Sequence, residues 1–377
     1  MNNAKKLTNR HWFEIDNVSE LDSPALVFYP DRIMDNIHTL KTSIDSASRL
    51  RPHVKTHKSA EVTLLMINAG ITKFKCATIA EAEMLAVCGA ADVLLAYQPV
   101  GPKVKRYLSL IKAFPQTKFS CLADNEQSLN ELSEAAVESE LQINLFLDLN
   151  LGMNRTGILP NDKALALYRK MHVSKGINAV GLHGYDGHIH NVSLSERREK
   201  WQVGWDAIKS LKDSITTSGL PEPIIVGGGT PTYPFYAEQA DVECSPGTFI
   251  LWDKGYQNSF EEQDYEIAAV LISRVISLPD ETKVSVDLGH KAVAAENELT
   301  KRVSFINAPD ARIISQSEEH LVLEMGKNHG FKIGDVLYGL PIHICPTVAL
   351  YDRAATVTDH KITGDWAIVS RNRKINI

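Results

Sequence analysis

Short apolar runs alternate with amphipathic stretches along the first two-thirds of the chain. Runs such as KFSCLA (118–123) and INLFLDL (143–149) have the length and composition of buried strands, and SLNELSEAAVES (128–139) between them is typical of a helix. Repeated strand–helix units indicate a parallel sheet covered by helices. Eight strands are predicted, at residues 51–54, 73–78, 92–97, 118–123, 143–149, 177–185, 223–229 and 241–245.

The number of these units favours a closed (β/α)8 barrel, the TIM barrel of the α/β class. The alternative is a doubly wound open sheet, whose dinucleotide-binding form carries a GxGxxG turn after its first strand. The chain has no such motif near its start. The last predicted strand follows TPTYPFYAEQA (230–240), which leaves room only for a short helix. We therefore predict a barrel.

The pattern changes near residue 255. From Glu266 onward, alternating strands are separated by Gly, Pro and Asp turns, and no long helical stretch is evident. We predict a barrel of residues 23–255 and a mainly-β domain that consists of residues 1–22 and 256–377 and carries the metal pair described below. The segment PALVFYP (24–30) is a further candidate for the β domain, since the barrel count is complete without it.

Composition and charge narrow the function classes. The 377 residues fit two domains. The 46 acidic and 40 basic residues give a net charge of −6, which disfavours nucleic-acid binding. Five cysteines without a CxxC pair are typical of reduced thiols in the cytoplasm. The first residues lack the apolar core of a secretion signal, and no run of 18 apolar residues would span a membrane. We therefore expect a cytoplasmic protein that binds neither nucleic acid nor membrane.

Polar residues gather where the predicted strands end. Lys55 follows the first strand, and Arg155 follows the fifth. The sixth strand ends in LHGYDGHIHN (182–191), which contains Tyr185 and His188. Because the carboxyl ends of barrel strands form the catalytic face of this fold, we expect these side chains to share one rim.

The seventh predicted strand ends in a glycine run, Gly227–Gly229, followed by Thr230. Consecutive glycines let backbone N–H groups approach an anion, and the threonine hydroxyl adds a donor. Barrels commonly bind phosphate after strands seven and eight. The alternative is a tight turn that needs glycine for a positive φ.

Lys55 lies in a basic segment with His53, His57 and Lys58. Neighbouring cations and partial burial lower the pKa of a lysine, as a Schiff-base lysine requires. The alternative is a solvated basic turn. A phosphate site and a lysine on one rim together suggest pyridoxal 5'-phosphate (PLP), which needs both.

Five motifs, taken in order, resemble one family. They are RPHVKTHKS (51–59), LGMNRTG (151–157), GGGTPT (227–232), SPGT (245–248) and HICPT (343–347). Together they are similar to the fold-type III PLP enzymes with an alanine-racemase-like fold, in the group of D-threonine aldolase and D-serine dehydratase. The resemblance covers nearly the whole chain.

The resemblance implies roles for the rim residues. Lys55 would form the Schiff base with PLP, Arg155 would hydrogen-bond its phenolic oxygen, and Tyr185 would lie near the pyridine nitrogen. The phosphate would be held by Gly228, Gly229 and Thr230. His188 would act as an acid or base near the substrate hydroxyl, although a loop histidine bonded to backbone is an equal reading. Enzymes of this family usually act as homodimers on a small amino-acid substrate.

The resemblance also implies a metal pair, His343 and Cys345, near the substrate hydroxyl. Residues at i and i+2 face the same side of an extended chain, and imidazole plus thiolate selects zinc over magnesium among divalent metals. From these residues alone, a hydrogen-bonded core histidine and a small buried cysteine remain the alternative. His-x-Cys points to the dehydratase branch, since the aldolase branch often carries His-x-Asp.

The resemblance thus implies a lyase for β-hydroxy D-amino acids, with Lys55 as Schiff base and a metal polarising the hydroxyl. Dehydration would give a keto acid and ammonia, whereas aldol cleavage would give glycine and an aldehyde. Two other functions stay open. One is an amino-acid racemase of the alanine racemase type, with Tyr338 in the region of the racemase tyrosine. The other is a non-enzymatic PLP carrier, although such carriers usually lack the β domain.

Overall fold

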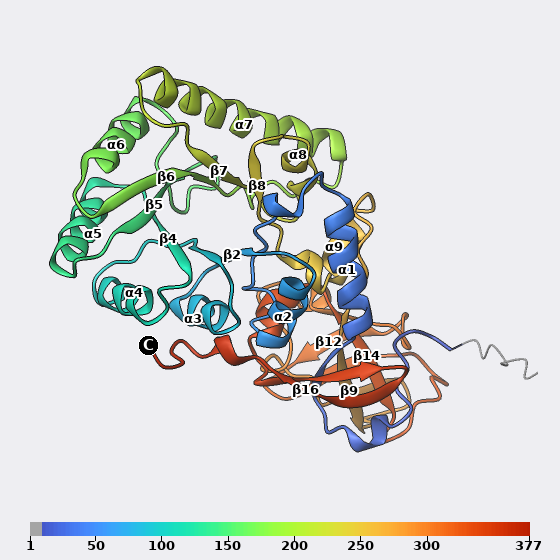
Figure 1. Ribbon diagram of the computed structural model, residues 1–377. Helices are drawn as coiled ribbons and strands as arrows, with labels where there is room; N and C mark the ends of the chain where they lie inside the picture. Colours follow the sequence, from blue (N-terminus) through green and yellow to red (C-terminus); the bar gives the residue numbers. More distant parts are fainter. Residues whose placement is uncertain (1–9) are drawn as a thin grey trace, which may run out of the picture. The chain divides into compact units, whose positions relative to one another are not determined.

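The computed structural model describes residues 10–377; residues 1–9, which include part of the predicted 1–22 segment, lie outside the described residues. The chain divides into two units (Figure 1). We call the first the barrel unit; it comprises Met34–Trp252, Tyr256–Glu266 and Ala367–Ile377. The second, the β unit, comprises the described residues up to Ile33 together with Asp253–Gly255 and Ile267–Trp366.

The barrel unit is built on a seven-stranded parallel sheet with the strands in sequence order. Apolar runs bounded by turns form these strands, as expected for strands buried on both faces. They are β2 (Lys73–Cys76), β3 (Asp92–Leu95), β4 (Lys118–Ala123), β5 (Ile143–Leu149), β6 (Ile177–Gly184), β7 (Ile224–Gly227) and β8 (Val242–Cys244).

The segment 50–54 joins the two edges of this sheet. Leu50 forms a parallel bridge with Cys244 of β8, and His53 forms one with Lys75 of β2. The backbone N–H of Val54 donates to the carbonyl of Lys75 at 2.9 Å. The first predicted strand is therefore present as two bridges, and the predicted barrel is confirmed.

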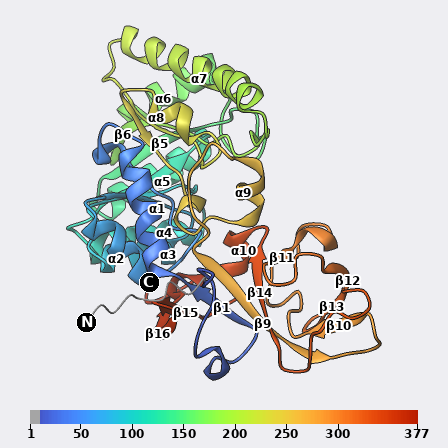
Figure 2. The same cartoon turned by 90° about the vertical axis from the view of Figure 1, so that its right-hand side faces the viewer.

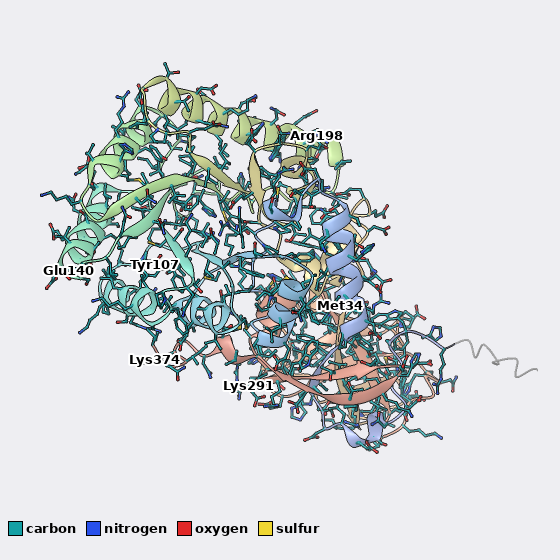
Figure 3. All side chains as sticks on the ribbon, viewed as in Figure 1. Met34, Tyr107, Glu140, Arg198, Lys291 and Lys374 are labelled. Atoms are coloured by element: carbon teal, nitrogen blue, oxygen red, sulfur yellow. The ribbon has the colours of Figure 1, made fainter. Side chains whose placement is uncertain are left out.

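Helices follow the strands and cover the outer side of the sheet (Figure 1). Helix α4, for example, buries Val104, Tyr107, Leu108 and Leu110 at helical spacing, and Tyr107 is labelled in Figure 3. Side chains of Thr78 and Asn125 cap the starts of α3 and α5. The helices are α1 (Pro30–Thr42, which begins in the β unit), α2 (Ala60–Asn68), α3 (Ile79–Val87), α4 (Pro102–Ala113), α5 (Glu126–Glu138), α6 (Asp162–Val173), α7 (Leu194–Thr217), α8 (Tyr233–Ala237) and α9 (Lys254–Ser259).

An apolar layer fills the barrel. Leu94, Leu122, Phe146 and Val226, from four different strands, pack together there. Asp148 lies two residues after Phe146, so it shares the inward face of β5 nearer the carboxyl end of the strand. The inward-facing positions therefore change from apolar to polar toward the rim.

The β unit contains a nine-stranded sheet (Figure 2). Its main path runs β12-β13-β10-β9-β1-β15-β16, with β14 pairing both β9 and β11. The strands are β1 (Ala25–Phe28), β9 (Ala269–Ser277), β10 (Lys283–Val286), β11 (Val303–Phe305), β12 (Arg312–Gln316), β13 (Leu321–Glu324), β14 (Val336–Pro341), β15 (Arg353–Thr358) and β16 (Lys361–Ala367).

The boundaries of the units differ from the predicted 23–255 and 256–377. Strand β1 pairs with β9 and β15, so residues 25–28 complete the sheet of the β unit. The last residues instead belong to the barrel unit, where the backbone N–H of Asn376 donates to the carboxylate of Glu83 at 3.0 Å. The hydrogen bonds of each segment, rather than its position in the strand count, decide this division.

The segment after β14 is a second correction. The sequence predicts alternating strands there, but Ile344–Val348 forms a short helix, α10. His343 is its N-cap residue, and Pro346 lies within the first turn, where a missing N–H leaves no intrahelical bond unmade. Within the described part of the chain, no helix is both long and apolar enough to span a membrane.

Candidate active site

A pocket of about 610 Å³ opens at the carboxyl ends of the barrel strands. Lys55, Arg155 and Tyr185 all line it, so the structure brings together the three residues predicted to surround the cofactor ring. Polar residues not predicted for the site line it as well, among them His53, Lys75, Gln98, Asp124, Asp148 and His183.

Lys55 extends from the segment that closes the barrel, and it is partly buried. Its backbone N–H donates to Nδ1 of His53 at 3.3 Å. Burial, reinforced by Lys55, holds the pKa of His53 well below its usual range, and burial lowers the pKa of His57 to about 3. Lys58 forms an ion pair with Glu81. The basic segment is therefore folded into the barrel, and the alternative of a solvated turn does not hold.

Lys75 is a second lysine in this pocket, which the sequence analysis missed. It is 1% exposed, and its Nζ lies 3.4 Å from the carbonyl oxygen of Gly228 and 5.5 Å from the ring centroid of Tyr185. Burial, together with the charge of Lys55, lowers the pKa of Lys75 to about 7, against the opposing effect of nearby Asp186. The pocket thus contains two amines.

Arg155 lies on the loop of residues 150–157, after β5. The side chain of Asn150 accepts hydrogen bonds from the backbone N–H groups of Gly152 and Asn154 at 3.0 and 3.1 Å, which shapes the loop. Gly157 has a φ of +94°, and a Cβ there would lie 2.5 Å from the backbone nitrogen of Asn150. Only glycine therefore fits this turn. The loop holds the Arg155 guanidinium 5.2 Å from the ring centroid of Tyr185.

Asp148 and His183 form a hydrogen-bonded pair at the base of the pocket. They are neighbours in the register of β5 and β6, and Nδ1 of His183 lies 2.7 Å from Oδ1 of Asp148. Nε2 of Gln98 donates to the other carboxylate oxygen of Asp148 at 2.9 Å. Nε2 of His183 is buried and has no hydrogen-bond partner among the described residues. One hydrogen-bonding atom at the base of the pocket is thus left unused.

The predicted phosphate residues follow β7. The N–H of Gly228 donates to the carbonyl of Gly184 at 2.9 Å, so this amide already has a partner within the barrel. Oγ1 of Thr230 accepts from the N–H groups of Gly247 and Thr248, both at 3.0 Å. This ties the GGGT loop to the SPGT loop, at the place where the sequence predicts an anion site.

Two other predicted residues occupy different surroundings. Gly229 packs beside Tyr185, where a Cβ would lie 3.1 Å from Cε2 of that ring. His188 does not line the pocket. Its ring packs against Gly152 of the 150–157 loop, so closely that a Cβ added to this glycine would lie 2.9 Å from Nε2 of His188.

The predicted metal pair lies in the β unit. The side chains of His343 and Cys345 hydrogen-bond to each other, and Nδ1 of His343 lies 2.6 Å from Oε1 of Glu296. Burial alone would lower the pKa of His343, but Cys345, Asp253 and Glu296 outweigh it and raise the pKa to about 9. In residues 10–377 no group of three or more His, Cys, Asp or Glu side chains is placed to hold a metal. The two predicted residues therefore lie together, beside Glu296, without a third side chain placed as a ligand among the described residues.

Lys75, Asp148, His183 and Gln98 were not predicted as functional. A signal existed for two of them, because a charged residue within an apolar strand is unusual: Lys75 in KFKC and Asp148 in INLFLDL. His183 was predicted to lie within its strand, which is confirmed. Its partner came to light only with the register of β5 and β6.

Comparisons with known proteins agree with this architecture. Residues 29–253 match the family model "Alanine racemase, N-terminal domain", and residues 268–357 match "Putative serine dehydratase domain". The D-threonine aldolase of Arthrobacter sp. is 26% identical over 364 residues, covering 94% of each chain.

Solved structures give the same fold. The D-threonine aldolase of Filomicrobium marinum matches with a TM-score of 0.86 and 23% identity, over 94% of this chain and 97% of that one. The D-threo-3-hydroxyaspartate dehydratase of Delftia sp. HT23 matches with a TM-score of 0.81 and 22% identity, over 92% and 97%. A variant of a dehydratase of that name is described in a metal-free form.

Proposed function

Because the chain belongs to the family of the alanine racemase N-terminal domain, as its motifs indicated, we propose that it is a PLP- and metal-dependent lyase for β-hydroxy D-amino acids. The convergence of Lys55, Arg155 and Tyr185 in one pocket carries this proposal. The serine dehydratase domain and the aldolase and dehydratase relatives support the reaction class.

The pocket fits PLP. An amine, a guanidinium and a tyrosine ring line a space of about 610 Å³, and the unused Nε2 of His183 offers a hydrogen-bonding position at its base. Lys55 would hold the cofactor as a Schiff base, and Arg155 would face its phenolic oxygen. When bound, PLP supplies an electron sink for the electrons released at Cα of the substrate. The phosphate would lie at the loop of Gly228, Gly229 and Thr230; the Thr230 hydroxyl would donate to it, since the N–H of Gly228 is already bonded to Gly184.

The side chains of the pocket prepare Lys55 to move protons. Nζ of Lys55 would take the proton from Cα once the substrate has displaced it. The charge of Lys55 and burial together lower the pKa of Lys75 to about 7, so a second amine of the pocket is partly neutral near neutral pH. His188, which packs against the 150–157 loop, would hold or transfer a proton at the substrate hydroxyl.

The His343–Cys345 pair fits a divalent metal. An imidazole nitrogen and a thiolate are the ligands that zinc prefers, and a two-ligand set leaves positions open to water and substrate. A metal held there would supply a Lewis acid for the β-hydroxyl. Glu296 would fix the orientation of His343 through Nδ1.

Dehydration is the first choice of reaction, since Cys345 matches the dehydratase branch. Aldol cleavage is the second, favoured by the D-threonine aldolase that is 26% identical over nearly the full length. We also propose that the enzyme is a cytoplasmic homodimer; its five free cysteines are consistent with a reducing compartment.

Product identification from D-threonine tests the proposal. Protein loaded with PLP and zinc should release 2-oxobutyrate and ammonia as a dehydratase, or glycine and acetaldehyde as an aldolase. L-Threonine and a chelator-treated sample serve as controls, and neither should react. Full activity after chelation, or no product from D-threonine, D-serine and 3-hydroxy-D-aspartate with loaded protein, would contradict it.

A further inference from the structure

The pocket contains a buried lysine that the proposed roles leave unused. Lys75 lies on β2, next to the segment 50–54 that precedes Lys55: His53 forms a parallel bridge with Lys75, and the side chains of both lysines line the pocket. Lys75 is 1% exposed, whereas Lys55 is only partly buried. Because little water surrounds Lys75, a charge on its amine is weakly screened and acts strongly on its neighbours.

The surroundings of Lys75 make its charge responsive. Nζ donates to the carbonyl oxygen of Gly228 at 3.4 Å. Burial, reinforced by the charge of Lys55, lowers the pKa of Lys75 to about 7, against the charges of Asp186 and Asp148. Burial raises the pKa of Asp186 to about 6, so this carboxyl is ionised above that pH. Lys75 therefore gains or loses a proton near neutral pH, in response to the charge on Lys55.

The other charged or titratable groups around Lys75 keep their charge states in this range. Arg51 acts on Lys75 as a cation, and Arg155 lies 5.2 Å from the ring centroid of Tyr185 that is 5.5 Å from Nζ of Lys75. Both guanidinium groups stay protonated. The histidines nearby are neutral at pH 7, because burial holds their pKa values below the usual range; they are His53 and His183.

The basic residues next to Lys55 in the sequence do not supply a comparable charge. The two histidines of the segment are neutral at pH 7, since burial lowers their pKa values well below that of free histidine. Lys58 forms an ion pair with the buried carboxylate of Glu81, which offsets its charge. The cationic partner of Lys55 is thus the lysine that β2 brings into the pocket, not a neighbour along the chain.

We infer that Lys55 and Lys75 are a coupled pair of amines, in which Lys75 carries the positive charge when Lys55 holds PLP as a neutral Schiff base. The inference rests on the proposed function and extends it. Because the interaction between two charges is mutual, Lys75 acts on Lys55 as strongly as Lys55 acts on Lys75. A neighbouring cation is one way to keep a Schiff-base lysine unprotonated. Lys75 would be a positioning residue that acts through its charge and needs no contact with the cofactor.

The proton balance gives Lys75 a task in the reaction. Condensation of the Lys55 ammonium with the aldehyde of PLP forms a C=N bond and releases water and one proton. Lys75 would take up this proton, because the repulsion from Lys55 has then ended. When the substrate later displaces Lys55, the charge on Lys75 would favour the neutral amine that removes the proton from Cα.

The first experiment is an absorbance titration of the PLP-loaded protein between about pH 6 and 10, which follows the protonated and neutral forms of the Schiff base. The midpoint should lie at least about one pH unit higher in Lys75→Met than in wild type, as expected for the loss of a nearby like charge. Lys75→Arg keeps a cation and should restore a low midpoint. Lys103→Met is the control: this exposed lysine lies 4.2 Å from the ring centroid of Tyr97 at the pocket, and water screens its charge.

A second measurement uses apoprotein and needs no cofactor. Loss of the Lys55 charge in Lys55→Met should raise the pKa of Lys75 above its value of about 7. Because the folded pKa lies below the unfolded one, stability increases with pH only above the folded pKa. In urea denaturation, this increase should begin about one pH unit higher in Lys55→Met than in wild type. Lys103→Met should keep the wild-type onset.

The outcomes separate this inference from the proposed function. A protein that forms no Lys55-linked absorbance band with PLP overturns the proposed function, whereas the apoprotein measurement still tests the coupling. Equal Schiff-base midpoints in wild type and Lys75→Met overturn the inference alone, and so does an equal onset in wild type and Lys55→Met. A midpoint that moves as far in Lys103→Met as in Lys75→Met also overturns it. If Lys75→Met does not fold, the onset in Lys55→Met decides.

Discussion

Replacing Lys75 by methionine should change how the stability of the apoprotein depends on pH. Lys75 is 1% exposed and shares the pocket with Lys55, His53 and Asp148. The charges of Asp148 and Asp186 act on it from nearby. Burial and Lys55 lower its pKa from 10.5 to about 7 in the folded protein. Methionine has a similar shape but carries no titrating group.

The sign follows from proton linkage. Between pH 7 and 10.5 the unfolded chain holds a proton on Lys75 that the folded protein lacks, so wild-type stability rises with pH. The slope approaches about 1.4 kcal/mol per pH unit, which amounts to roughly 3 kcal/mol between pH 7 and 9 as an upper bound. Below pH 7 both states are protonated, so the burial penalty is constant there. The variant should lack this rise.

Urea denaturation of apoprotein from pH 6 to 9 measures the difference. The buried Trp201 and Trp205 of α7 report unfolding of the barrel unit by fluorescence. The free energy of unfolding of Lys75→Met should exceed that of wild type most at pH 6, and the gap should narrow as pH rises. The exposed Lys105→Met on α4 is the control and should run parallel to wild type. Parallel curves for Lys75→Met as well would refute the reasoning.

Three further changes test other parts of the structure. Glu296→Ala removes the acceptor that orients His343, so zinc affinity should fall about 10- to 100-fold in a competition titration. Arg51→Met removes the buried guanidinium that bridges Asp92 and Glu243; each carboxylate keeps a lysine partner, Lys118 or Lys73, and chemical denaturation should show a loss of about 2–3 kcal/mol. Gly157→Ala should distort the loop that carries Arg155, and a PLP titration should show weaker binding.

Each of these changes has a matched control. Glu298→Ala removes a nearby exposed carboxylate and should leave zinc binding intact, and Arg169→Met removes an exposed arginine at little change in stability. Gly89 has a φ of +83°, but a Cβ at this position would meet nothing within 4 Å, so Gly89→Ala carries backbone strain without the clash. PLP binding weakened equally by Gly89→Ala and Gly157→Ala would contradict the role of the 150–157 loop. Unchanged zinc affinity in Glu296→Ala would contradict the role of Glu296 in orienting His343. A loss below about 1 kcal/mol in Arg51→Met would contradict the contribution of the Arg51 ion pairs to stability.

The barrel could be predicted because its strands are short apolar runs with sharp ends. KFSCLA and INLFLDL coincide with β4 and β5 residue for residue. The assignment of β1 to a unit was harder, because pairing partners 240 or more residues away decide it. Helix α10 has only five residues, too few for a helical period to stand out from a strand.

The site divides in the same way. Lys55, Arg155 and Tyr185 follow strand ends, and the fold carries strand ends to one rim. The Asp148–His183 pair depends on the register of β5 and β6, which shifts between Leu145 and Phe146. Sequence periodicity does not specify such a shift. Lys75 lies within β2, and the sequence alone does not specify whether its side chain faces the inside of the barrel or the helices.

Borohydride reduction of the PLP-loaded protein, followed by peptide mass mapping, tests the central claim most directly. Reduction converts a Schiff base into a stable secondary amine. Two lysine amines, Lys55 and Lys75, line the pocket. The account predicts the pyridoxyl group on Lys55, within RPHVKTHKS, and loss of the label in Lys55→Ala. A label on Lys75, or no label from protein saturated with PLP, would contradict it.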